Sequence, residues 1–148
     1  RRRFGLIGET KSGALIYDDY AHHPTEVAAT LQGFRETFPN RRLIVAFQPH
    51  LFTRTRDHYE SFGSVFSNCD ELLVCDIYPA REAPIEGVTG ELVSKSAQER
   101  GHRDARFVGA KENVLSTLQG ELSDKDLVVL MGAGNITQLG RELLEGDF

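Results

Sequence analysis

The chain has 148 residues, of which 40% are hydrophobic and 26% are charged. These values are typical of one globular domain that is large enough to bury a core. The formal net charge is −5 and the charges are spread along the sequence, which argues against a nucleic-acid-binding protein. No apolar run approaches the roughly 20 residues that span a bilayer. With no signal-peptide pattern either, we expect a cytoplasmic protein without a membrane partner.

The first half of the chain alternates between strand and helix patterns. Residues 3–19 predict two strands in an antiparallel pair, joined by a polar turn. Pro24 then opens a helix, because a missing N–H costs nothing in the first turn. The buried stripe of this helix consists of Val27, Leu31, Phe34 and Phe38. Pro39 ends the helix, and residues 43–47 are apolar on both faces, as in a central parallel strand.

The second half continues the alternation. We expect a helix from about Arg56 to Phe66, a strand at 72–78, a helix from about Glu91 to Arg100, a strand at 105–109, a helix from about Lys111 to Leu118, a strand at 127–131 and a last helix from about Ile136 to Leu144. Alternating strands and helices favour parallel pairing through right-handed crossovers. The predicted fold is a three-layer α/β domain with about five parallel strands and one antiparallel edge strand. Cys69 and Cys75 lack C-x-x-C spacing and are expected to be buried free thiols.

Polar segments follow the strands at one end of the predicted sheet. In a parallel sheet the carboxyl ends of the strands share one edge, and ligands bind in crevices there. The segments that leave this edge are the most polar, Gly-rich and Pro-rich in the chain: "DDYAHHP" (18–24), "QPHLFTRTRD" (48–57), "DIYPAREAP" (76–84) and "GAGN" (132–135). The turns at the other ends of the strands are plain. We therefore expect the site at the carboxyl edge.

The first of these segments predicts a nucleotide site. Asp19 is able to accept both hydroxyls of a ribose, Tyr20 offers an aromatic face to a base, and His22 is able to donate to a phosphate near a helix N-terminus. Its other polar residues have simple structural explanations: Asp18 as a turn residue, His23 as the helix N-cap and Glu26 as a partner of the helix dipole.

The second segment predicts a site for a carboxylate or a phosphate. His50, Arg54 and Arg56 lie within one stretch of seven residues shortly after a buried strand, and guanidinium groups bind such anions well. The alternative is that Arg54 or Arg56 pairs with Asp57 or Glu60 on a solvated helix face.

The remaining Gly-rich and His-rich patterns do not match established motifs. "MGAGNI" lacks the third glycine of a dinucleotide fingerprint, where Thr137 stands, so tight packing is its expected use. "GETKSG" has Thr10 where a phosphate loop needs a glycine before the lysine. "HHPTE" lacks the spacing of a zinc motif, and we expect no metal site in the chain.

The four polar segments, in this order and spacing, closely resemble the C-terminal domain of the Mur ligases, specifically of the ligase that adds L-alanine to UDP-N-acetylmuramic acid. The resemblance covers essentially residues 1–148 and implies a Rossmann-like domain from a larger three-domain enzyme of peptidoglycan synthesis. It implies ATP and Mg²⁺ as cofactors, with the metal ligands mainly outside this chain. The partners implied are UDP-N-acetylmuramic acid, L-alanine, and N-terminal and central domains of the same protein. The sequence begins with Arg1 rather than Met, which agrees with a fragment.

The resemblance also assigns roles to individual residues. The implied cofactor-binding residues, near the ATP ribose and base, are Arg3, Asp19 and Tyr20. The implied catalytic residues are His22 at the reaction centre, with His50 and Arg54 near the incoming amino acid. Leu51 stands where some relatives have a basic residue, and this shifts the expected carboxylate contact to Arg54.

Three other interpretations remain open from the sequence. A ligase that recycles murein peptide shares the first segment, but it resembles "EPRSNT" after the second strand and lacks "GAGN". A free-standing nucleotide-binding module would bind ATP or NAD alone, and a hydrolase using His22, His23 and His50 would bind zinc. Because the 148 residues contain no G-x-x-x-x-G-K-[ST], we expect the isolated domain to be inactive even if the whole protein is a ligase.

Overall fold

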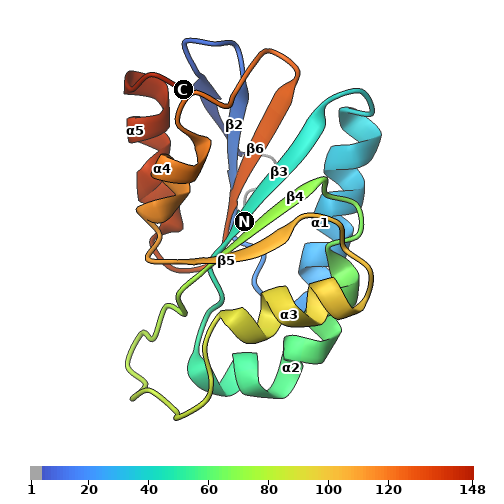
Figure 1. Ribbon diagram of the computed structural model, residues 1–148, viewed down its shortest axis with the longest axis vertical. Helices are drawn as coiled ribbons and strands as arrows, with labels where there is room; N and C mark the ends of the chain where they lie inside the picture. The colour runs from blue at the N-terminus through green and yellow to red at the C-terminus, as the bar shows by residue number, and fades with distance from the viewer. Residues whose placement is uncertain (1–4) are drawn as a thin grey trace.

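The computed structural model describes residues 5–148, which form one six-stranded sheet with helices on both faces (Figure 1). The strands are β1 (Gly5–Glu9), β2 (Leu15–Asp19), β3 (Arg42–Phe47), β4 (Glu71–Cys75), β5 (Ala105–Gly109) and β6 (Asp126–Met131). The helices are α1 (Pro24–Thr37), α2 (Phe52–Val65), α3 (Glu91–Glu99), α4 (Asn113–Leu118), the 3₁₀ helix η1 (Ile136–Gln138) and α5 (Leu139–Glu145).

The sheet has the strand order β1-β2-β6-β3-β4-β5. Strand β1 pairs antiparallel with β2 at one edge, and all the other pairs are parallel. The prediction of a three-layer, mostly parallel domain with one antiparallel edge strand is confirmed. Strand β6, the last in the sequence, lies between β2 and β3, so the turns that follow β2 and β3 stand on either side of the turn that follows β6.

The two faces of the sheet have separate cores. Helices α1, α2 and α3 cover one face, whereas α4 and α5 cover the other (Figure 1). Successive side chains of a strand point to opposite faces. In β3, for example, Val45 and Phe47 belong to the first core, and Ile44 and Ala46 to the second. Central strands of this kind are apolar throughout because both faces are covered.

The turn from β2 into α1 is built as the sequence indicates, with one difference. His23 is the N-cap of α1, and its side chain with that of Glu26 forms a capping box around Pro24 in the first turn. Asp18, however, lies within β2 rather than in a turn, because β2 pairs with β6 as far as Asp19. Strand β2 therefore extends into the polar segment and ends at Asp19.

Several element boundaries differ from the predictions. Helix α2 begins at Phe52 rather than near Arg56, and strand β4 ends at Cys75 rather than at residue 78. Helix α4 begins two residues later than expected, and the last helix is divided into η1 and α5. The early start of α2 follows a sharp backbone turn at Leu51, whose φ of 74° is unusual for a residue other than glycine.

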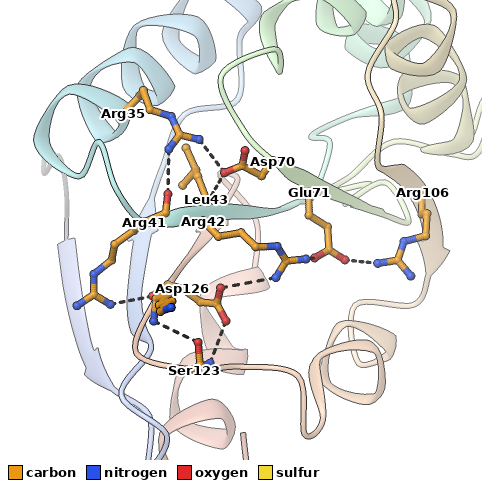
Figure 2. A network of polar contacts seen from close by, with 10 residues as sticks. Arg35, Arg41, Arg42, Leu43, Asp70, Glu71, Arg106, Ser123 and Asp126 are labelled. Atoms are coloured by element: carbon orange, nitrogen blue, oxygen red, sulfur yellow. Dashed lines mark hydrogen bonds and ion pairs between the residues drawn. The ribbon is translucent and has the colours of Figure 1, made fainter.

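Charged side chains at the amino ends of the parallel strands, here called the amino edge, pair with one another (Figure 2). The buried Glu71 carboxylate accepts a hydrogen bond from Arg42 Nη2 at 2.5 Å and another from Arg106. Arg42 also lies 3.6 Å from Asp126. These ion pairs join β3, β4, β5 and β6. The charged side chains at the amino edge are therefore paired with one another and stabilise the sheet.

Cys69 and Cys75 are buried free thiols, as predicted. None of the helices in residues 5–148 has both the length and the apolar composition needed to cross a membrane.

Candidate functional site

Three of the predicted site residues meet at the carboxyl edge, the end of the sheet from which α1 and α2 depart. His22 lies in the turn after β2, His50 in the turn after β3, and Arg54 in the first turn of α2. The ring centroids of His22 and His50 are 5.5 Å apart, and Arg54 Nη1 lies 3.5 Å from His50 Nδ1. We call these three residues the His–Arg cluster.

The hydrogen bonds of His22 define which of its nitrogens is available. Its Nδ1 lies 2.8 Å from the main-chain oxygen of Tyr20. A carbonyl oxygen only accepts, so Nδ1 carries the proton and donates. The neutral ring then keeps a lone pair on Nε2. Glu26 lies 3.6 Å from Nδ1 and supports this orientation of the ring.

The environment of His50 favours its neutral form. Burial lowers the pKa of His50, and the nearby His22 and Arg54 lower it further. The guanidinium of Arg54 only donates, so His50 Nδ1 faces it as an acceptor. The ring also stacks on Tyr78, with centroids 5.8 Å apart and an interplanar angle of 13°. His50 is therefore held between a cation and an aromatic ring.

The two arginines of α2 have different partners. Arg56 Nε donates to Asp57 at 2.9 Å on an exposed part of the helix, as the alternative interpretation predicted for it. Within residues 5–148, Arg54 makes no ion pair with a carboxylate. A half-buried guanidinium next to a neutral imidazole is a suitable binding group for the carboxylate of a ligand.

Asp19 lies beneath the surface, whereas Tyr20 is open to solvent. Asp19 is only 3% exposed because it is the last residue of β2 and pairs with Met131. Its Oδ1 accepts from the main-chain N–H of Ala21 at 2.8 Å, and its buried Oδ2 has no hydrogen-bond partner among residues 5–148. Tyr20 is 49% exposed. The structure thus does not place Asp19 on the same open surface as His22, and Arg3 lies outside the described residues.

An acceptor oxygen such as Asp19 Oδ2 fits a hydroxyl donor, because a buried acceptor without a partner is costly. The exposed ring of Tyr20 next to it fits the apolar face of a base. Both features suit a nucleoside.

Gln48 and Tyr78, which sequence reasoning did not single out, connect the turns around the site to the "GAGN" turn. Gln48 Oε1 accepts from the main-chain N–H of Asn135 at 2.9 Å, and Gln48 Nε2 donates to the side chain of Asn135 at 2.8 Å. A Cβ atom on Gly134 would lie 2.5 Å from both Gln48 Oε1 and Tyr78 Cγ. The "GAGN" turn is therefore packed tightly against the turn after β3, which agrees with the expected packing role. The sequence contained a signal for these two residues, because Gln48 and Tyr78 both follow predicted buried strands.

No set of three His, Cys, Asp or Glu side chains in the described part of the chain is arranged to hold a metal ion. A cavity of about 470 Å³ lies at the amino edge, between the ends of α2 and α3, where Cys69 and His102 line it. It is at the opposite end of the strands from the His–Arg cluster. The residues with suitable chemistry are instead on the open carboxyl edge.

The chain is similar to known ligases over nearly its whole length. It is 44% identical to the UDP-N-acetylmuramate–L-alanine ligase of Salinibacter ruber, with 99% of this chain and 31% of the relative covered. It is 46% identical to the protein of the same name from Syntrophobacter fumaroxidans, with 97% and 30% covered. The chain therefore spans about 30% of the length of these curated relatives.

Solved structures agree on the fold. The UDP-N-acetylmuramate–alanine ligase of Thermotoga maritima superposes with a TM-score of 0.78 at 26% identity, covering 98% of this chain and 29% of that one. A murein peptide ligase from Psychrobacter arcticus reaches the same TM-score at 22% identity, covering 97% and 29%, and this likeness shows the fold alone.

A family model assigns the chain more directly than any single relative. The model described as "Mur ligase, glutamate ligase domain" matches residues 2–134, which include the first three polar segments of the carboxyl edge and the fourth as far as Gly134. The chain therefore belongs to the Mur ligase family.

Proposed function

We propose that this chain is the C-terminal domain of a longer, three-domain, ATP-dependent ligase that joins L-alanine to UDP-N-acetylmuramic acid in peptidoglycan synthesis. The observation that carries the proposal is the His–Arg cluster, in which Arg54 has no carboxylate partner among residues 5–148, in a chain of this family. The names of the curated relatives at 44% and 46% identity support the same reaction.

Arg54 is proposed to bind the carboxylate of L-alanine. In the proposed reaction the lactyl carboxylate of the sugar is activated as an acyl phosphate, and the amine of alanine attacks it. A guanidinium that holds the alanine carboxylate orients the amine, and such orientation is a major source of rate enhancement. His50, held neutral against Arg54, leaves the positive charge of the pocket on the guanidinium. His22 Nε2 keeps a lone pair for a proton of the attacking amine.

The ATP side of the site is proposed to use Asp19, Tyr20 and Arg3. Asp19 Oδ2 would accept from a ribose hydroxyl and Tyr20 would lie against the base. We propose that the Mg²⁺ ligands and the phosphate-binding loop belong mainly to a central domain, and the UDP-sugar site to an N-terminal domain. These 148 residues contain no phosphate-loop motif, so the isolated chain is expected to be inactive. ATP-dependent ligation by the isolated chain would refute that expectation.

The test is phosphate release by the longer protein with ATP, UDP-N-acetylmuramic acid and either L-alanine or a murein tripeptide. The proposal expects turnover with L-alanine, and turnover with the tripeptide alone would refute it. Arg54→Ala should raise the KM for alanine about 10- to 100-fold, the usual consequence of losing a hydrogen bond to a charged group. The matched control is Arg56→Ala. Arg56 is exposed and already paired with Asp57, so its loss should leave the KM for alanine unchanged.

A further inference from the structure

We propose that Glu82 is a positioning residue, which caps helix α2 and thereby holds His50 and Arg54 in place for the amino-acid carboxylate. The inference rests on the proposed function and extends it to a residue in the long segment between β4 and α3. The first part of that segment, residues 76–84, is one of the four polar segments of the carboxyl edge. Its Tyr78 stacks on His50, but Glu82 has no role in the site described above.

The N-terminus of α2 has no cap of its own. Its N-cap is Leu51, whose side chain makes no capping hydrogen bond, although the helix is 14 residues long. Glu82 takes this place from 30 residues away in the sequence. Glu82 Oε1 accepts from the main-chain N–H of Phe52 at 2.5 Å and of Thr53 at 3.1 Å, and Oε2 accepts from the Thr53 hydroxyl. These hydrogen bonds, led by that of the Thr53 hydroxyl, lower the pKa of Glu82, so the carboxylate is charged at neutral pH.

The same segment is also joined to the backbone on either side of His50. The N–H of Tyr78 donates to the main-chain oxygen of Pro49 at 2.8 Å. The N–H of Leu51 donates to the main-chain oxygen of Tyr78 at 2.9 Å. The Tyr78 ring stacks on His50 between these two contacts. The segment from Tyr78 to Glu82 thus fixes both the His50 ring and the first turn of α2, in which Arg54 lies.

Glu82 also decides where a carboxylate of the substrate is able to bind. The free N–H groups and the dipole at a helix N-terminus attract anions. Glu82 occupies the N–H groups of Phe52 and Thr53 at the start of α2, so a second carboxylate does not find these two free. Arg54, the cation at the third position of the helix, has no carboxylate partner among residues 5–148. Capping by Glu82 therefore directs the incoming carboxylate to the guanidinium.

The test compares three variants of the longer protein by steady-state kinetics. Glu82→Ala removes every capping contact and should raise the KM for L-alanine about tenfold, within the range that helix-cap losses span. The KM values for ATP and for the UDP-sugar should stay within about twofold, because the side-chain hydrogen bonds of Glu82 go to α2. Glu82→Gln keeps an acceptor oxygen for the two main-chain N–H groups, so its KM for alanine should lie between wild type and Glu82→Ala.

The matched control is Glu86→Gln, an exposed carboxylate in the same segment, which should behave as wild type. The inference is overturned if Glu82→Ala binds alanine as wild type does, or if all three KM values rise together, which would indicate general loss of structure. Should Glu82→Ala fail to fold, Glu82→Gln decides alone: an alanine KM equal to that of Glu86→Gln overturns the inference. A wild-type protein that does not use alanine refutes the proposed function, and the inference with it.

Discussion

Replacing Glu71 by glutamine should destabilise the domain without affecting the candidate site. The Glu71 side chain is 5% exposed and lies between Arg42 and Arg106 at the amino edge (Figure 2). Glutamine has nearly the same shape but no charge. The substitution therefore leaves two guanidinium groups facing one another with only an amide oxygen between them.

The size of the effect follows from the exposure of the partners. Removing one partner of a fully buried ion pair costs about 3–5 kcal/mol, whereas exposed pairs contribute about 0.2–1 kcal/mol. The side chains of Arg42 and Arg106 are 44% and 50% exposed. They also keep contacts of 3.6 Å to Asp126 and 3.4 Å to Asp104. We therefore expect the free energy of unfolding to fall by about 2 kcal/mol, between the two limits.

Urea unfolding of the chain, followed by circular dichroism, measures this difference. Glu121→Gln is the matched control, because Glu121 is an exposed carboxylate at the same edge, and it should change the unfolding free energy by less than about 0.5 kcal/mol. In the longer protein, Glu71→Gln should leave the KM for alanine unchanged. A loss for Glu71→Gln no larger than that of Glu121→Gln would show that the network does not stabilise the sheet, and the reasoning would be refuted.

Three further predictions concern packing, protonation and thiol reactivity. Gly134→Ala should lower the unfolding free energy by about 1–3 kcal/mol in thermal denaturation, because the new Cβ would lie 2.5 Å from Tyr78 Cγ; a stability equal to wild type would contradict this. NMR titration should give His50 a pKa below 6.5. The contribution of this neutral side chain to stability is then complete above pH 6.5, and it is lost as the pH falls through the pKa of the folded state. A pKa above 6.5 would be contrary evidence. Burial raises the pKa of Cys75 to about 12, and it also raises the pKa of Cys69. Neither thiol should therefore react with a disulfide reagent until urea unfolds the chain. Rapid labelling of the native protein would contradict this prediction.

Local patterns in the sequence were sufficient for most elements of the fold. The stripe of apolar residues in α1, the capping by His23 and the apolar run of β3 depend on neighbours within a few positions, so they are readable without coordinates. The rule that parallel strands share a carboxyl edge also brought His22, His50 and Arg54 together correctly.

Contacts between distant segments decided the rest. Helix α2 starts at Phe52 because a carboxylate 30 residues away caps it, and no pattern within α2 indicates that. Asp19 is buried because β6, more than 100 residues later, pairs along the whole of β2. Hydrogen bonding and burial of this kind depend on which strands become neighbours, and that order results from packing of the whole domain. The sequence by itself therefore determined the chemistry of the carboxyl edge, while the tertiary structure decided which of its groups are exposed, paired or capped.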